Sequence, residues 1–311
     1  MKTLSRSGFD RAKEIIFKRG REIEKSIFEN LFYNGTRKSI VDSVRAFQNE
    51  DGGFGNGLES DFRMIESSPM ATSIGIRLLK DLDDRYDASD SIQRAIVYLE
   101  GVFDENRSGW WSVSKKVNDY PHTPWWEFDI AKNSTVIDAS WGNPTAEIIA
   151  YFYRYRKYVK KLDARALKDI AIEKLLQKEE FKSEHEIYCY IKLYYELDEE
   201  DQRKIEGKIE EAVDKLLIRN RKKWEGYVPR PLDFVKAPDH KKFGVETSLI
   251  EAHINQLLDE LEQYGKISPS WGDSYYEGDF KGAYYEWEAK LTLETLRILS
   301  RYGYIKERDL I

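Results

Sequence analysis

The segment 48–68 holds the pair of residues best suited to catalysis. Glu59 and Asp61 stand two positions apart in a glycine-rich stretch. Neighbouring carboxyl groups can act as general acid and general base, or can bind a cation or a polar substrate group. Arg63 can pair with either acid or hold a substrate anion. The alternative is that Asp61 caps backbone amides of the loop and that Arg63 neutralises it. We predict catalytic roles for Glu59 and Asp61 and substrate binding for Arg63.

A histidine can donate or accept a proton near neutral pH, and 4 histidines occur in the chain. His122 has the setting most like an active site, because aromatic and acidic residues follow it closely: Trp125, Trp126, Glu127 and Asp129. The alternative is a histidine that hydrogen bonds simply fix within the loop. We predict His122 as the third catalytic residue.

Most of the 8 tryptophans lie in or beside long loops. They are Trp110, Trp111, Trp125, Trp126, Trp141, Trp271 and Trp287. Aromatic faces around a cavity can stabilise a carbocation by cation–π attraction, or can stack on sugar rings. The alternative is that the rings pack the loops onto helix ends. We predict that these tryptophans line a cavity and contact a small-molecule ligand.

Several common site motifs are missing from the chain. It contains no phosphate-binding loop, no dinucleotide-binding fingerprint and no Gly-x-Ser-x-Gly elbow. Nucleotide-dependent and serine-hydrolase functions therefore have no support, and we predict no cofactor.

The composition limits the class of protein. With 311 residues, the chain is long enough for one large or two ordinary domains. Charged residues make up 34% with a net charge of −6, which argues against nucleic acid as a partner. The single cysteine suits a reducing compartment. Neither a signal peptide nor a membrane span is expected. We therefore expect a cytoplasmic protein, and the sequence leaves its oligomeric state open.

Apolar residues recur at helical spacing through most of the chain, and no convincing strand pattern occurs. We therefore predict an all-α fold. The expected helices cover 9–32, 36–47, 69–83, 90–104, 144–160, 163–177, 184–197, 199–220, 246–264 and 287–303.

The expected helices are of two kinds. The stretch 199–220 carries a single apolar stripe, as expected of an outer helix. The stretches 70–76 and 187–191 are weakly polar all round, as expected of helices covered on several sides. Alternation of the two kinds favours helical hairpins that form an inner and an outer layer. Simple helix bundles are the alternative.

The long loops of the chain share a glycine-and-aromatic composition. They cover 48–68, 105–143, 221–245 and 265–286. Two of them run from a glycine–aromatic turn to a Ser-Pro or Asn-Pro helix start, at Pro69 and Pro144. This is a faint internal repeat. If the hairpins repeat with one hand, several of these loops gather at one rim.

The motif Gln48-x-x-Asp51-Gly52-Gly53-Phe54 resembles the glutamine/glycine/aromatic repeat of the terpenoid cyclase and protein prenyltransferase superfamily. The likeness is strongest over 40–80 and weaker over 108–150 and 257–300. Proteins of that superfamily are α/α toroids. The resemblance therefore implies a single α/α-toroid domain over 1–311, with paired inner and outer helices.

Two patterns bear on the chemistry of that superfamily. Asp81-Leu82-Asp83-Asp84 matches the D-x-D-D acid motif of class II terpenoid cyclases, but it lies at a polar helix end and reads as a solvated turn. His185 and Cys189 stand four apart, a spacing that could hold zinc as in the prenyltransferases. The superfamily's aspartate two residues before the cysteine is replaced by Ile187. We therefore predict no metal.

Three hypotheses for function follow. The first is a terpenoid cyclase- or prenyltransferase-like protein that binds or transforms an apolar, prenyl-type substrate in an aromatic-lined central cavity. The second is a carbohydrate-active helical-barrel hydrolase or lyase that acts on small oligosaccharides. The third is a non-catalytic binding scaffold. The sequence leaves open whether the chain is an enzyme.

Overall fold

The computed structural model describes residues 2–83 and 88–306. Twelve α-helices and five short 3-10 helices lie in this part of the chain, and its only β-type pairings are isolated bridges. The prediction of an all-α fold is confirmed.

The chain divides into two compact units. Unit 1 comprises residues 1–43 and 217–311, and unit 2 comprises residues 44–216. The helix α3 (Arg37–Arg45) carries the chain across the first boundary. The prediction of a single domain over 1–311 stays a prediction.

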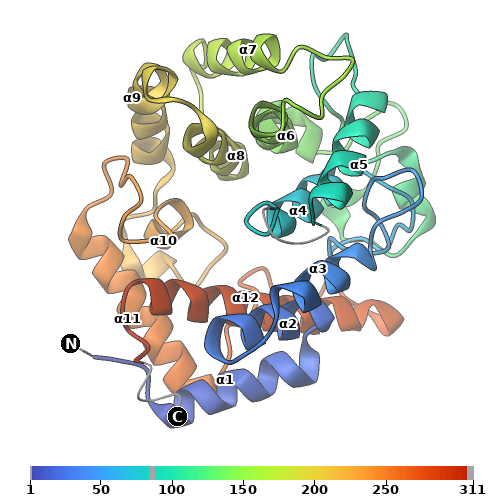
Figure 1. The fold of residues 1–311 in the computed structure, drawn as a ribbon. Coiled ribbons are helices and arrows are strands. Elements are labelled where there is room, and N and C mark those ends of the chain that lie inside the picture. The colour runs from blue at the N-terminus through green and yellow to red at the C-terminus, as the bar shows by residue number, and fades with distance from the viewer. Residues whose placement is uncertain (1, 84–87, 307–311) are drawn as a thin grey trace. The chain divides into compact units, whose positions relative to one another are not determined.

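Unit 2 consists of two rows of helices (Figure 1). The first row contains α4 (Pro69–Leu79), α6 (Gly142–Arg154) and α8 (Glu184–Glu196). The second row contains α5 (Ala88–Gly101), α7 (Ala164–Leu176) and α9 (Glu199–Leu216). Each second-row helix packs on the first-row helix that precedes it, and α6 contacts both α4 and α8. The unit is therefore a series of helical hairpins in two layers.

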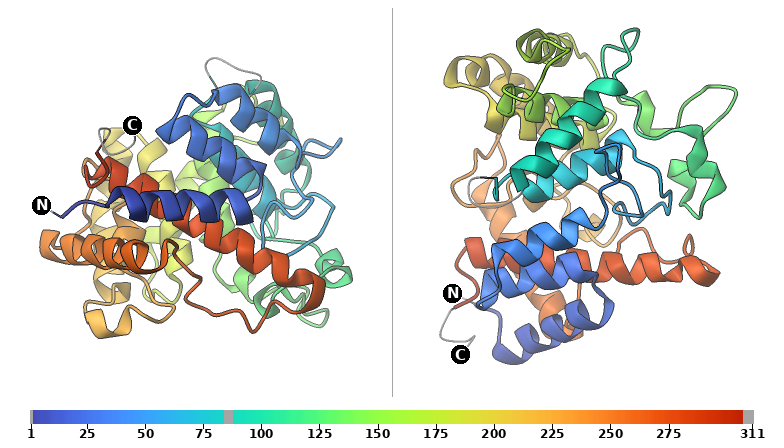
Figure 2. Two further views of the ribbon diagram at one scale, coloured as in Figure 1. Left: turned by 90° about the horizontal axis from the view of Figure 1, so that it is seen from below. Right: turned by 45° about the vertical axis from the view of Figure 1, so that its right-hand side comes forward.

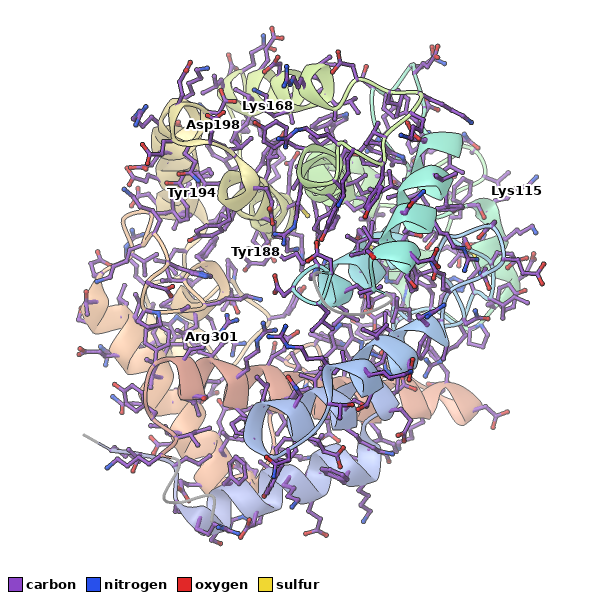
Figure 3. All side chains as sticks on the ribbon, viewed as in Figure 1. Lys115, Lys168, Tyr188, Tyr194, Asp198 and Arg301 are labelled. Carbon is purple, nitrogen blue, oxygen red and sulfur yellow. The ribbon has the colours of Figure 1, made fainter. Side chains whose placement is uncertain are left out.

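The helices α4 and α9 show how burial differs between the two rows, in agreement with their sequences. Nine of the residues of α4 are buried, on all sides of the helix, because its side chains are small or apolar. In α9 the buried residues form one stripe, which includes Ile205, Ile209 and Val213. Lys168 of α7, labelled in Figure 3, donates to the carboxylate of Asp201 of α9, so these two second-row helices are also joined by an ion pair.

Side-chain caps fix where several of these helices begin. The hydroxyl of Ser68 accepts from the amide of Ala71 at 3.1 Å, and Pro69 occupies the first turn of α4. Asp163 accepts from two amides at the start of α7, and the hydroxyl of Ser183 accepts from the amide of Glu186 at the start of α8. These caps satisfy amides that have no partner within the helix.

Unit 1 is built on α1 (Arg6–Arg19), α2 (Glu22–Phe32), α11 (Thr247–Tyr264) and α12 (Lys281–Arg301), with the short α10 (Pro231–Phe234). The helix α1 packs against α2, α11 and α12, which joins the two ends of the chain in one core (Figure 2). The 3-10 helices of this unit are η4 (Arg221–Lys223) and η5 (Gly278–Phe280).

The predicted helix over 9–32 is in fact two helices. The chain is extended at Gly20 and Arg21, and the amide of Gly20 closes α1 by donating to the carbonyl oxygen of Ile16. Arg21 and Glu24 form a capping box that starts α2. The last helix begins at Lys281 instead of 287, and the loop 221–245 contains α10.

The glycine–aromatic turns of unit 2 are built alike. The amide of Phe54 donates to the hydroxyl of Thr72 at 2.9 Å, and the amide of Trp110 donates to the hydroxyl of Thr145 at 3.1 Å. Both threonines lie near the start of a first-row helix. In the first turn, the side-chain amide of Gln48 also donates to the carbonyl oxygens of Gly52 and Ser91. The repeat seen in the sequence therefore has a structural counterpart.

Candidate functional site

Two distant loops pair to form one cluster in unit 2. The loop 105–143 contains η1 (Lys115–Asp119), η2 (Pro124–Trp126) and η3 (Ile137–Ala139). It meets the loop 48–68 at an antiparallel bridge between Phe62 and His122. On either side of the bridge, the amide of Arg63 donates to Pro121 and the amide of Thr123 donates to Asp61, both at 2.9 Å.

This pairing brings together six of the residues predicted from sequence. We call them, with Ser60 and Phe62, the loop cluster: Glu59, Ser60, Asp61, Phe62, Arg63, His122, Trp125 and Trp126. The ring of Phe62 packs edge-on against that of Trp126 at 5.0 Å. The cluster is therefore a packed unit and not a set of separate loop side chains.

Both carboxylates of the loop cluster are buried. Glu59 is 7% exposed and Asp61 is 6% exposed. The indole nitrogen of Trp125 donates to Oδ2 of Asp61 at 3.0 Å, and the amide of Asp61 lies 3.4 Å from Oε1 of Glu59. A buried carboxylate with a fixed donor is held in one orientation, as an acid–base residue must be. The same contacts would also serve a purely structural carboxylate.

His122 is held between two acceptors. Its Nδ1 lies 2.6 Å from the carbonyl oxygen of Tyr120, and its Nε2 lies 2.7 Å from Oε2 of Glu127. Only the doubly protonated ring can donate to both. The side chain of His122 is 12% exposed, whereas that of Glu127 is 62% exposed. The pair therefore joins a nearly buried imidazole to an exposed carboxylate at the edge of the loop cluster.

Two polar atoms of the loop cluster have no partner within the described protein. They are the hydroxyl of Ser60 and the indole nitrogen of Trp126, and both are buried. Buried polar groups are nearly always hydrogen-bonded. Each of these two atoms is therefore an unsatisfied polar group in the interior of the loop cluster.

Three further tryptophans of unit 2 lie together around a different centre. Trp110 is fully buried, donates to the carbonyl oxygen of Leu99 at 2.7 Å and contacts two phenylalanine rings. Trp111 lies 4.3 Å from the guanidinium of Arg107, and Trp141 donates to the carbonyl oxygen of the same arginine. Trp110 thus packs its turn onto the helices, which is the alternative role considered for the tryptophans.

Trp271 and Trp287 belong to unit 1. Their rings pack edge-on at 5.2 Å, and Trp271 is also edge-on to Tyr227 at 5.4 Å. Lys290 lies 3.9 Å above the ring of Trp287. The tryptophans predicted as one set therefore form three local groups.

A charged cluster that the sequence reasoning missed lies in the first row of unit 2. Glu147 of α6 is 1% exposed and accepts from Nε and Nη2 of Arg77, on α4, at 2.6 and 2.7 Å. Lys192 of α8 donates to it at 2.8 Å, and the hydroxyl of Tyr151 donates at 2.6 Å. We call Arg77, Glu147 and Lys192 the Glu147 triad. Its sequence signal is a charged residue in the middle of each of three largely buried helices.

The triad and its surroundings have shifted pKa values. Burial alone would raise the pKa of Glu147, but Arg77 and Lys192 hold that pKa well below its usual range. Burial and the charge of Arg77 lower the pKa of Lys192. Burial raises the pKa of the Cys189 thiol to about 12. Cys189 is therefore a protonated core thiol and not a nucleophile.

The two motifs considered for the superfamily's chemistry do not form sites among the described residues. Cys189 is buried whereas half of the His185 side chain is exposed, and no described group of three His, Cys, Asp or Glu side chains could hold a metal ion. Of the D-x-D-D motif, Asp81 is exposed and Asp83 is partly exposed, while Asp84 lies outside the described residues.

Two hollows on the surface lie away from the candidate residues. One, of about 480 Å³, is lined by the segment 156–165 of unit 2. The other, of about 400 Å³, is lined in unit 1 by Lys13, Phe17, Glu29, Tyr33, Asn34 and Gly35. Neither contains a residue of the loop cluster or of the Glu147 triad.

Comparison of the chain with models of protein families, with curated proteins and with solved structures finds no match. Within the described part of the chain, no helix has the length and apolar character needed to cross a membrane.

Proposed function

We propose that the chain is a single α/α-toroid domain of the terpenoid cyclase and prenyltransferase kind. Its function in this proposal is to bind or transform an apolar, prenyl-type small molecule in an aromatic-lined central cavity. The observation that carries the proposal is the repeated turn of unit 2. Phe54 and Trp110 each follow glycine and each donate a backbone amide to a threonine of the next first-row helix. Two turns with the same bond support a repeated helical-hairpin architecture.

In this proposal the loop cluster is the reactive site. Asp61 and Glu59 act as acid and base, and His122 exchanges protons with solvent through Glu127. Arg63 holds a polar group of the ligand. The supporting observations are the burial of both carboxylates and the fixed orientation that Trp125 gives to Asp61.

The ligand contacts are the second part of the proposal. They are assigned to the tryptophans predicted from sequence: Trp110, Trp111, Trp125, Trp126, Trp141, Trp271 and Trp287. Trp126 has the strongest local support, because its indole nitrogen is buried without a partner in the described protein. Trp110 has the weakest, because it is fully buried and hydrogen-bonded. The proposal requires neither a metal nor a cofactor.

The test is ligand binding by the purified chain and three variants. Farnesol should raise the melting temperature of the wild-type protein and should bind saturably in calorimetry. Asp61→Asn and Glu59→Gln should each lower the affinity for the ligand or the rate of turnover at least tenfold. The melting temperature without ligand should stay unchanged. Glu50→Gln is the matched control, since Glu50 is an exposed acid of the same loop. If both buried-acid variants bind and turn over ligand like the control, the site assignment is wrong.

One observation favours a second candidate, a carbohydrate-active enzyme. The unpartnered hydroxyl of Ser60 and indole nitrogen of Trp126 lie in the same cluster as two buried carboxylates. Sugar hydroxyls would satisfy all of these groups. The same assays with maltotriose, cellotriose and xylotriose separate the two candidates. Saturable binding of any ligand without turnover would instead support the third hypothesis, a non-catalytic scaffold.

A further inference from the structure

The two cations of the Glu147 triad share a single acid. Among residues 2–83 and 88–306, the carboxylate contacts of Arg77 and Lys192 all go to Glu147. Tyr151 and Cys189 add a hydroxyl and a thiol to that carboxylate, and both side chains are uncharged because burial raises the pKa of each. The triad therefore carries one positive charge in excess, in a chain whose net charge is −6.

The charges at the C-terminal ends of the same helices are balanced by contrast. Lys80 and Arg154 both bond to Glu196, at 2.9 and 3.2 Å. Asp83 adds a second negative charge beside Arg154. Two cations thus face two acids there. The excess charge is confined to Arg77 and Lys192.

The geometry of Arg77 leaves one edge of its guanidinium for another partner. Glu147 occupies Nε and Nη2, which form the side edge of the group. The end edge, formed by Nη1 and the second hydrogen of Nη2, has no carboxylate partner among the described residues. Two parallel N–H groups of this kind match the oxygens of a carboxylate or a phosphate.

Lys192 has spare donors at the same place. Its ammonium group has three hydrogens, and Glu147 takes one of them. The side chain of Arg77 is 36% exposed and that of Lys192 is 33% exposed, whereas the acid beneath them is buried. The free donors therefore lie on the accessible side of the triad.

A similar triad in unit 1 differs at its arginine. Glu288, fully buried, bonds to Arg19 and Lys266 and also accepts from the hydroxyl of Ser268 at 2.9 Å. The ring of Tyr285 lies 4.7 Å from the guanidinium carbon of Arg19 and covers it. This second triad serves as an internal comparison, because it has the same charges with a covered arginine.

We propose that Arg77 and Lys192 form a binding site for the oxyanion group of a small molecule, either a carboxylate or a phosphate. Glu147 positions the two cations from below and is not itself a ligand contact. The site is distinct from the loop cluster, so its test is independent of the test of the proposed function.

The experiment is a titration of the isotope-labelled full-length chain with inorganic phosphate and, separately, with sodium acetate at constant ionic strength. Chemical shifts of the Arg77 side-chain Nε–H and of the α8 backbone amides near Lys192 report the binding. At least one of the two anions should produce saturable shifts at both places. The tighter of the two identifies the chemistry of the natural group.

Variants make the test specific. Lys192→Gln should weaken the binding at least fivefold, and Arg77→Lys should weaken it because the planar end edge is lost. Lys266→Gln, which removes the equivalent lysine of the unit 1 triad, should change the affinity less than twofold. If Lys192→Gln does not fold, Lys192→Met at the same ionic strength takes its place. The absence of saturable shifts, or equal weakening by Lys192→Gln and Lys266→Gln, would overturn the proposal.

Discussion

At the scale of single residues, the buried charges of unit 2 show how desolvation and pairing compete. Moving a carboxylate out of water costs several kcal/mol, and the attraction of a buried ion pair only roughly offsets this cost. Glu147 is almost fully buried and has two cations and a hydroxyl as partners. Removing the carboxylate charge leaves those cations facing each other without compensation. The loss of folding stability should therefore exceed the net free energy that the ion pairs contribute to folding.

We predict that Glu147→Gln lowers the free energy of unfolding by about 2–4 kcal/mol. This is somewhat less than the cost of breaking a fully buried ion pair, because both cations reach solvent. Urea denaturation at neutral pH measures this. Glu211→Gln is the control, since Glu211 forms exposed pairs on α9 and its loss should cost about 0–1 kcal/mol. Equal effects of the two substitutions would contradict the assignment.

The same variant should change the pH dependence of stability. The pKa of Glu147 is lower in the folded chain than its usual value of 4.5. Its contribution is therefore complete above about pH 5 and is lost as pH falls below 4.5, because the unfolded chain then binds the proton first. Wild-type stability should fall more steeply in acid than that of Glu147→Gln. Parallel curves for the two proteins between pH 5 and 2 would show that the carboxylate is not held in this way.

His253 provides a second pH-dependent contribution, in unit 1. It is buried, its Nδ1 accepts from the amide of Leu232 at 3.2 Å, and its ring packs on Trp224 at 5.3 Å. Burial, and secondarily the charge of Arg230, lowers its pKa to about 3. Below about pH 6.5 the unfolded chain gains a proton that the folded chain does not, so stability falls with falling pH.

We predict that this residue contributes a slope of up to about 1.4 kcal/mol per pH unit between pH 6.5 and 5. His253→Asn keeps an acceptor for the Leu232 amide but has no titrating ring, so the slope in this window should be smaller in the variant. Urea denaturation across the window measures both slopes. A variant whose slope equals that of the wild-type chain would show that His253 is not neutral in the folded state.

At the scale of elements, local sequence signals predicted most helices and missed features that depend on distant partners. The start of α4 was predictable because Ser68 and Pro69 are adjacent in sequence. The break between α1 and α2 was not, because the apolar spacing continues through Gly20 and the capping box uses an arginine in place of the usual short polar residue. The boundary between α1 and α2 therefore depends on tertiary packing and not on a local sequence signal.

The candidate site shows the same limit. Six of the eight residues of the loop cluster were found from local composition. Their convergence depends on a bridge between Phe62 and His122 that no local pattern indicates. The Glu147 triad was missed because its three members lie on three helices far apart in the chain. In the sequence, Glu147 stands near the start of a helix, where an acidic residue is favoured without any distant partner.

The packing between the first glycine–aromatic turn and α4 can be tested at Gly75. A Cβ atom there would lie 2.6 Å from the buried ring of Phe54. Alanine improves helix propensity by about 1 kcal/mol, but overpacking costs about 1–3 kcal/mol, and the fixed ring makes the clash the larger effect. We predict that Gly75→Ala lowers the free energy of unfolding by about 1–2 kcal/mol in urea denaturation.

Gly207 is the matched control for this substitution. It lies within α9, and a Cβ atom there meets nothing within 4 Å. Gly207→Ala should therefore stabilise the chain by about 0.5–1 kcal/mol through propensity alone. If both substitutions stabilise the protein, the ring of Phe54 is not packed against α4 as described.

At the scale of the whole molecule, the order of the chain makes the two units unequal. Unit 2 is one continuous segment, whereas unit 1 is assembled from residues 1–43 and 217–311. While unit 2 is folded, it holds its two ends at a fixed separation. Once it unfolds, unit 1 must close a loop that comprises the whole of unit 2, at an entropic cost of about 4–5 kcal/mol. Unfolding of unit 1 imposes no such cost on unit 2.

We therefore predict that destabilisation spreads in one direction. Gly75→Ala, in unit 2, should raise amide hydrogen exchange in α6 and α8 and also in α11 and α12. Leu296→Ala removes a fully buried side chain of unit 1, at a cost of about 2–5 kcal/mol, and should raise exchange mainly in α11 and α12. Peptide-resolved exchange in mild denaturant measures both patterns. An equal rise in exchange in both units from either variant would contradict this asymmetry. It would favour one cooperative domain over 1–311, because only in such a domain would destabilising either core raise exchange in the other unit to the same degree.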